Sequence, residues 1–466
     1  MDIMSKGTKG KLALPKTKVL LGIAIVAVLV ISSSLYFILP ILAPQEKTLV
    51  FMHSAASPRE QGAVQDIIDS FMEQNPGVTV TQEPVAEDIV REKMDIAIAA
   101  GTVADILYIG GGDVVGMAKQ GVLLPLDDVR AELTGQSDAF YKFSEYDGKT
   151  YGIPHNLVGN MFLYNIDHFE EAGIPLPPMS GWTWNEFTDA ADKLTVDKDG
   201  DGMIDVHGWL NPTAKDWPSF SWGHALTVAL GGSYYKLVGD EFVPNLDSPE
   251  FKKMLELTAD LQQYSPPSAG VTGDEFHRLF AMGKVSMAPD SGRALMAIEE
   301  NNPGLIGRIG TTSMPVPPGR PTNVVYGTVA WMDYLNVSTD SKNPELAKKF
   351  VLHFMTGDDY IRWVTLMPTL VFPSRDYVFD EPAWNEATSV KNWPGALEGY
   401  WLNLKNGFHP AFELGIGPNV NSMEMNYSGH VQDAMQEVIL KGEPIDKVAK
   451  KYQKMVEEEI GNFPYE

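Results

Sequence analysis

Apolar runs typical of buried strands alternate with helical spacings near the start of the chain, after residue 46. Apolar residues recur at i, i+3, i+4 and i+7 from Val64 to Phe71, which predicts one face of a helix. The preceding Ser57-Pro58-Arg59-Glu60 is typical of a helix start, with an N-cap, a proline in the first turn and a capping-box glutamate. Strand patterns lie at 49–52, 78–81 and 106–109, and a second helical face lies at 90–98. This alternation predicts an α/β domain with a largely parallel sheet.

Polar residues follow two of these strand patterns. His53 and Ser54 come directly after the first strand, and Asp113 follows three glycines after the third. Ligands of such sheets bind at the carboxyl ends of the strands. We therefore expect His53, Ser54 and Asp113 at a ligand site, together with Arg59 in the first turn of the following helix.

The rest of the chain continues the mixture of strands and helices without a fixed-period repeat. Its 466 residues allow two to four domains. Four prolines between 315 and 321 indicate a stiff crossing segment. Strands are predicted at 161–165, 285–288 and 324–337, and helices at 185–194, 250–264, 274–282, 345–355 and 431–440.

Residues 19–43 form an apolar run that follows five lysines between Lys6 and Lys18. The run is long enough to cross a bilayer, which needs about 20 residues. A cleavable signal has a shorter core of roughly 7–15 residues. The length therefore favours a retained transmembrane anchor over a removed signal peptide. Because lysines stay on the cytoplasmic side, 1–18 would be cytoplasmic and the chain after about residue 46 would lie outside the cell.

Composition narrows the range of partners. Lys+Arg 36 against Asp+Glu 61 gives a net charge of −25, which repels phosphate backbones and disfavours a nucleic-acid partner. The chain has no cysteine, so disulfides, thiolate metal sites and a lipid-modified cysteine anchor are excluded.

Several motifs of the exported part match one family in order and spacing. They are Glu73 to Val78 with Ala104 to Ile106, Tyr151 to Pro154 with Leu163 to Asn165, Phe169 to Pro175, Thr183 to Phe187, Phe280 to Met287, and Lys342 to Phe350. Over about residues 47–460 the chain resembles the extracellular sugar-binding proteins of ABC importers, the maltose-binding-protein-like family. The resemblance implies a two-lobed, periplasmic-binding-protein-like α/β fold with a ligand cleft between the lobes, here preceded by one N-terminal transmembrane helix.

The resemblance also implies how the chain divides between the lobes. The N-terminal lobe would comprise 47–154 and 312–366, and the C-terminal lobe 155–311 and 367–466. The turn at 151–154 and the prolines at 315–321 suit hinges, which are loop positions that absorb backbone rotation. A protein anchor would replace the lipid-modified cysteine of many relatives, and the protein would work as a monomer on the outer face of the cell membrane.

Sugar binding needs aromatic faces for the ring carbons and planar polar groups for the hydroxyls. All ten tryptophans lie at residue 182 or later, so the stacking platform is expected from the second lobe and the returning strand. Trp209, Trp217 and Trp222 lie where relatives carry stacking aromatics, and Trp331 lies in the returning strand. An ordinary half-buried role is the alternative for each. Asp290 and Arg293 lie where relatives again place binding residues, and a pair that only fixes a loop is equally consistent.

An acidic loop in the second lobe resembles a calcium-binding loop. Its carboxylates occupy positions one, three, five and nine of the EF-hand pattern, at Asp197, Asp199, Asp201 and Asp205. Position twelve is Gly208 instead of the bidentate glutamate. A weak structural calcium site and a solvated acidic turn are equally consistent with this pattern, and no other cofactor is expected.

The chain shows no Ser-His-Asp order, HExxH motif or phosphate-binding loop, so we expect no enzymatic activity. The expected function is capture of a carbohydrate for the permease of an ABC transporter. Among carbohydrates, an oligosaccharide is the expected ligand. The same fold with a non-sugar ligand, such as a phosphorylated polyol, a polyamine or a peptide, is the alternative. An anchored polysaccharide hydrolase is a further alternative, and it would need two carboxylates roughly 5–9.5 Å apart.

Overall fold

The computed structural model describes residues 47–54, 57–86, 89–267, 271, 273–366, 371–407 and 422–464. The predicted transmembrane anchor at 19–43 lies outside these ranges. Within them, no helix combines the length and the apolar character that crossing a membrane requires.

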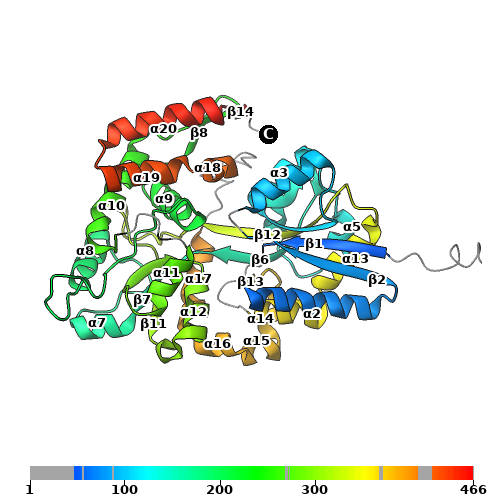
Figure 1. The fold of residues 1–466 in the computed structure, drawn as a ribbon, viewed down its shortest axis with the longest axis horizontal. Helices are drawn as coiled ribbons and strands as arrows, with labels where there is room; N and C mark the ends of the chain where they lie inside the picture. Colours follow the sequence, from blue (N-terminus) through cyan, green and yellow to red (C-terminus); the bar gives the residue numbers. More distant parts are fainter. Residues whose placement is uncertain are drawn as a thin grey trace, which may run out of the picture.

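The first lobe is built on a six-stranded sheet in the order β13-β6-β12-β3-β1-β2 (Figure 1). Its strands β1, β2 and β3 are parallel, as the sequence predicts, whereas β12 runs antiparallel to both β3 and β6. The sheet is therefore mixed. The strand bounds are β1 (Lys47–His53), β2 (Val78–Pro84), β3 (Ile106–Gly110), β6 (Ile153–Gly159), β12 (Ala330–Val337) and β13 (Phe372–Pro373).

Helices cover both faces of this sheet because successive strand residues point to opposite sides. Phe51 of β1 packs with α2, α13 and α14, and its neighbour Met52 packs with α3 and α4. The predicted capping box at Ser57 and Glu60 is present and starts α2. The helix bounds are α2 (Pro58–Gln74), α3 (Val90–Ala100), α4 (Gly111–Lys119), α5 (Asp127–Glu132), α13 (Pro344–Phe354) and α14 (Gly357–Leu366).

The second lobe is built on a smaller antiparallel sheet with β7 (Met161–Asn165) between β10 (Met287–Asp290) and β11 (Ile309–Thr312). Its aromatic core packs between this sheet and the surrounding helices. The helices are α7 (Ile166–Ala172), α8 (Trp184–Lys193), α9 (Trp217–Ala229), α10 (Pro249–Leu261), α11 (Gly273–Ala281), α12 (Arg293–Asn301), α18 (Ser422–Ser428), α19 (His430–Lys441) and α20 (Ile445–Glu459). A hairpin of β8 (Tyr235–Val238) and β9 (Glu241–Pro244) pairs with β14 (Phe463–Pro464).

The chain crosses between the lobes later than the resemblance implied. Strand β6 stays in the first sheet to Gly159, so the first crossing lies at Asn160 and not at 154. The prolines at 315–321 are not the hinge, because Val316 exchanges backbone hydrogen bonds with Trp182 and Trp184 of the second lobe. The return occurs near Val329, whose carbonyl accepts the Asn160 N–H at 3.1 Å, so these two crossings lie side by side.

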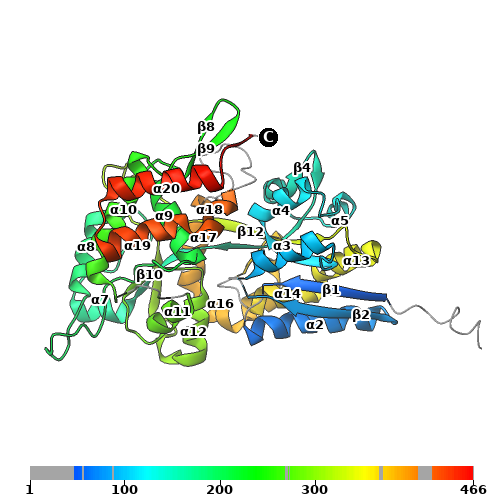
Figure 2. The same cartoon turned by 45° about the horizontal axis from the view of Figure 1, so that its top comes forward.

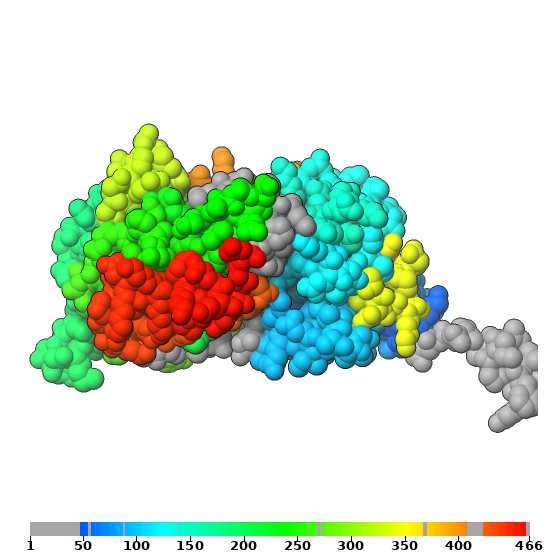
Figure 3. All heavy atoms as spheres, turned by 90° about the horizontal axis from the view of Figure 1, so that it is seen from above, coloured from blue at the N-terminus to red at the C-terminus, as the bar shows by residue number. Residues whose placement is uncertain are grey.

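The third crossing also falls after the implied boundary at 366, since β13 still pairs with β6 of the first sheet. Beyond it, α15 (Pro382–Glu386), α16 (Thr388–Asn392) and α17 (Pro394–Asn406) pass from the first lobe to the second, and α17 contacts both β6 and β11. The alternation of apolar residues along a strand does not indicate which sheet the strand joins. The implied lobe boundaries therefore differ from those in the structure. Figures 2 and 3 show the resulting two lobes side by side.

Candidate ligand-binding site

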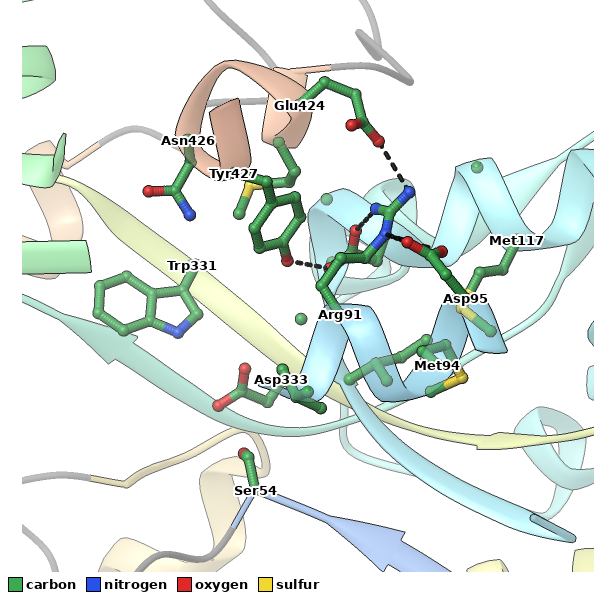
Figure 4. Close-up of a pocket in the computed structure, with 18 of the residues that line it drawn as sticks. Ser54, Arg91, Met94, Asp95, Met117, Trp331, Asp333, Glu424, Asn426 and Tyr427 are labelled. Carbon is green, nitrogen blue, oxygen red and sulfur yellow. Dashed lines mark hydrogen bonds and ion pairs between the residues drawn. The ribbon is translucent and has the colours of Figure 1, made fainter. Parts of the chain in front are cut away.

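A cavity of about 210 Å³ lies where the two lobes meet, at the carboxyl end of β3 (Figure 4). The first lobe supplies Ser54 after β1, the inner faces of α3 and α4, and Trp331 and Asp333 of β12. The second lobe supplies Trp217 at the start of α9 and the side chains of α18. The position agrees with the rule that open α/β sheets bind ligands beyond the carboxyl ends of their strands.

One guanidinium organises the polar side of the cavity. Arg91 of α3 pairs with Asp95 at 3.0 Å, with Asp113 of α4 at 3.1 Å and with Glu424 of α18 at 2.8 Å. The guanidinium also lies over the ring of Tyr427, 5.2 Å from its centroid. Burial opposes the charge of Arg91, but the three carboxylates outweigh it and raise its pKa. Arg91 is therefore a fixed cation that joins the lobes.

Asp113 is the most enclosed member of this cluster. Its carboxylate accepts a hydrogen bond from the Tyr427 hydroxyl at 2.8 Å in addition to the pair with Arg91. Burial raises the pKa of Asp113, and the neighbouring guanidinium and hydroxyl act in the opposite direction. The carboxylate is positioned to accept hydrogen bonds from a polar ligand.

Aromatic rings form the apolar side of the cavity. Trp331 and Trp217 meet edge to face, with ring centroids 5.1 Å apart and planes at 76°. The Trp217 indole N–H is buried and has no acceptor among the described residues. Asp333, next to the rings, is 7% exposed and accepts hydrogen bonds from the Tyr108 hydroxyl and the Asn156 amide, both at 2.9 Å. Ring faces beside carboxylates suit a polyhydroxylated ligand.

Three residues expected at the ligand site line this cavity: Ser54, Asp113 and Trp331. His53 ends β1 but is fully buried, and its Nε2 lies 3.1 Å from the Gln82 side-chain oxygen. Burial lowers the pKa of His53. It supports the strand that carries Ser54 and does not line the cavity.

The structure places Trp209 and Trp222 in the core of the second lobe and not at the cavity. They are 0% and 1% exposed. The Trp209 ring stacks on Phe162, with centroids 5.2 Å apart, and packs against Trp222 at 5.1 Å. Because both indoles are covered by protein on all sides, neither offers a face to a ligand in this structure. Of the three clustered tryptophans, Trp217 is the one that lines the cavity.

The cavity is not lined by Arg59, Asp290 or Arg293. Arg59 pairs with Glu299 at 3.4 Å. Asp290 caps α12 by accepting the N–H groups of Gly292 and Ala294, at 2.6 and 3.0 Å, and lies 2.9 Å from His277 Nε2. Arg293 pairs with Glu60 at 3.5 Å and borders a second hollow. The loop-fixing alternative was a pair between Asp290 and Arg293. Asp290 instead contacts His277 and two backbone N–H groups, and Arg293 contacts Glu60.

The acidic loop brings three of its four carboxylates together. Oxygen atoms of Asp197, Asp199 and Asp205 lie within 4.8 Å of one another. Asp197 accepts the N–H groups of Gly200 and Gly202 at 2.7 and 2.8 Å, and these bonds lower its pKa. The fourth carboxylate, Asp201, instead accepts the N–H of Met203 at 2.7 Å. None of the four lines the cavity.

No motif in the sequence marks four of the cavity residues as ligand-binding candidates: Arg91, Asp333, Glu424 and Tyr427. Arg91 and Tyr427 lie on helical stretches whose polar residues resemble any solvated face. Tyr427 and Asp113 are 314 residues apart in the chain, so no local pattern relates them. Only the alternation of β12 could have placed Asp333 on the same face as Trp331, two residues earlier.

Comparison with known proteins identifies the family of this two-lobed chain with its interlobe cavity. Residues 66–392 match the model of the bacterial extracellular solute-binding protein family. The chain belongs to this family. A protein of Brucella abortus is 27% identical to this solute-binding protein over 301 residues, covering 64% of this chain and 69% of the other. The diacetylchitobiose binding protein DasA of Streptomyces coelicolor is 26% identical over 276 residues, covering 58% and 60%.

Solved structures share the fold of this solute-binding protein. Maltose-bound MalE3 of Thermotoga maritima has a TM-score of 0.73 at 19% identity and covers 88% of this chain and 99% of its own. The resemblance to sugar-binding proteins of ABC importers and the two-lobed fold are thereby confirmed. The implied lobe boundaries are the part of that expectation that the structure changes.

Proposed function

We propose that this protein captures a carbohydrate outside the cell and delivers it to the permease of an ABC transporter. The observation that carries the proposal is the interlobe cavity, in which Trp331 and Trp217 supply ring faces next to the carboxylates of Asp113 and Asp333. Sugar rings need this combination of a flat apolar surface and hydrogen-bond acceptors. Relatives named for diacetylchitobiose and maltose support the same class of ligand.

The charge of the cavity argues against a phosphorylated polyol. Four of its described lining residues are acidic, whereas Arg91 is the one cationic residue among them. That guanidinium is already paired with three carboxylates. The internal segments outside the described ranges contain no lysine or arginine that could reverse this balance. A phosphate group would therefore enter a site of its own charge.

The same balance favours a polyamine as the second candidate ligand. Protonated amines are attracted by carboxylates and by the faces of aromatic rings, and this cavity supplies both. A polyamine would be bound by the same fold and delivered in the same way. The two candidates differ in how steeply their binding depends on salt, because screening weakens the attraction of the charged ligand itself in addition to any effect on the protein.

The mechanism that we propose involves no covalent chemistry. The ligand would bind to one lobe, the second lobe would close over it, and the permease would recognise the closed form. The apolar run at 19–43 would hold the domain on the outer face of the membrane, close to the permease. The acidic loop at 197–205 would bind calcium weakly and act in stability, not in ligand binding.

Isothermal titration of the full chain in detergent, combined with tryptophan fluorescence, tests the ligand class. The panel contains maltose, cellobiose, diacetylchitobiose, mannitol and spermidine, and mass spectrometry identifies any solute retained through purification. Binding of a neutral glycan in the micromolar range, about −8 kcal/mol, with a change in indole emission supports the proposal. Binding of spermidine alone would replace carbohydrate by polyamine, and release of a cleaved glycan would show a hydrolase.

A further inference from the structure

Two groups of polar and charged side chains join the lobes directly, one at each rim. On the cavity side, Arg91 of α3 pairs with Glu424 of α18 at 2.8 Å. Beside this pair the Tyr427 hydroxyl donates to Asp113 at 2.8 Å, again from the second lobe to the first (Figure 4). Both contacts must break when the lobes separate at this rim.

The second group lies at the other rim, where α2 faces α12. Arg293 of α12 pairs with Glu60 of α2 at 3.5 Å, and Arg59 of α2 pairs with Glu299 of α12 at 3.4 Å. Each lobe thus contributes one cation and one anion. Glu299 is held in place by the Ser389 hydroxyl at 2.8 Å and the Trp393 indole N–H at 3.0 Å. In Figure 1, α3 and α18 lie above strands β6 and β12, and α2 and α12 lie below them.

We propose that these two groups form a salt-sensitive latch that sets how much of the ligand-free protein has its lobes closed. Closure around a ligand is already part of the proposed function; the latch acts before any ligand arrives. At least one member of each ion pair is 24–40% exposed, so mobile ions reach it, whereas Glu60 and Glu299 are only 5% and 12% exposed. The apparent dissociation constant of a ligand rises as the binding-competent fraction falls. The affinity for an uncharged ligand should therefore decrease with ionic strength.

The absence of cysteine makes a direct test convenient, since two introduced cysteines give unique labelling sites. Glu132→Cys at the end of α5 and Lys454→Cys in α20 place one dye on each lobe at exposed positions. Single-molecule energy transfer is then measured on the full, ligand-free chain from 20 mM to 1 M NaCl. The readout is the ratio of closed to open molecules, and it does not depend on the identity of the ligand.

The test variant is Arg293→Gln with Glu424→Gln, which breaks one ion pair at each rim. The matched control is Arg278→Gln with Glu437→Gln, which removes the same charges from pairs that lie within the second lobe. Because at least one member of each pair is partly exposed, each substitution should change the ratio about two- to fivefold. Because the rims are separate, the effects should multiply to roughly 4- to 25-fold.

We expect the closed fraction of the parent to fall as the salt concentration rises. The closed fraction of the test variant should be lower at 20 mM NaCl and should depend less on salt. The control variant should behave like the parent. Equal ratios in parent and test variant at 20 mM NaCl would overturn the latch. A parent ratio that is independent of salt would overturn it as well, and this measurement needs no substitution in the latch. Far-UV circular dichroism identifies any variant that has failed to fold. These outcomes can be interpreted even if the carbohydrate proposal fails, because no ligand is added in the measurement.

Discussion

His155 should make this protein lose stability in mild acid. The residue lies on β6 and is fully buried. Its ring is surrounded by aromatic side chains, with the centroid of Tyr108 at 4.4 Å and those of Phe354 and Trp363 at 5.9 and 6.0 Å. Burial lowers the pKa of His155 from 6.5 to about 3, against a smaller opposing effect of the Asn156 side chain. The folded protein therefore keeps this imidazole neutral at a pH where the unfolded chain protonates it.

The direction and size of the effect follow from proton linkage. The unfolded state binds a proton below pH 6.5 and the folded state binds it only near pH 3, so the free energy of unfolding falls as the pH decreases between these values. One pH unit corresponds to about 1.36 kcal/mol. At pH 5, about 1.5 units below the unfolded pKa, His155 should cost about 2 kcal/mol. Because pH 5 lies above the folded pKa, this figure depends little on the exact folded value.

Urea denaturation of the parent and of His155→Leu at pH 7 and pH 5 measures this cost. Leucine keeps apolar packing but cannot titrate, and its packing effect cancels when the two pH values are compared within one variant. The parent should lose about 2 kcal/mol more than His155→Leu between pH 7 and pH 5. Equal losses in the two proteins would refute the reasoning, because they would show that His155 is protonated in the folded state or does not titrate in the unfolded state.

Three further predictions concern the ligand site, the acidic loop and the N-terminus. Trp331→Ala should weaken binding of the glycan found in the titration by about 1–2 kcal/mol, roughly 5- to 30-fold, whereas the core substitution Trp209→Phe should lower the melting temperature with little change in affinity; the reverse pattern would move the stacking platform into the second lobe. Millimolar calcium should raise the melting temperature by a few degrees, since ligand at ten times its dissociation constant adds roughly 1.4 kcal/mol, and Asp199→Ala with Asp201→Ala should remove the rise; equal melting temperatures in chelator and calcium would favour a solvated turn. Protein from native membranes should begin near Met1 and need detergent for extraction, and a soluble form that begins between residues 32 and 46 would contradict a retained anchor.

The sequence by itself determined the local elements of this protein. The capping box at Ser57 and Glu60, the apolar face from Val64 to Phe71 and the strand patterns around it each depend on residues within a few positions of one another. Such patterns report which side of an element is buried, so α2 and the parallel strands β1 to β3 could be predicted. The order and spacing of the motifs also indicated the family, and the family implied the two-lobed fold.

Only the tertiary structure decided which side chains meet in the cavity. Trp209, Trp222 and Trp331 look alike in the sequence, but two are enclosed by the second-lobe core and the third faces the space between the lobes. Arg91 joins carboxylates from three helices, and its partner Glu424 is distant from it in the sequence. The cavity is assembled from segments that come together when the chain crosses between lobes. Local periodicity does not indicate which segments come together at the cavity, because a pattern that predicts a buried face does not specify the element that packs against it.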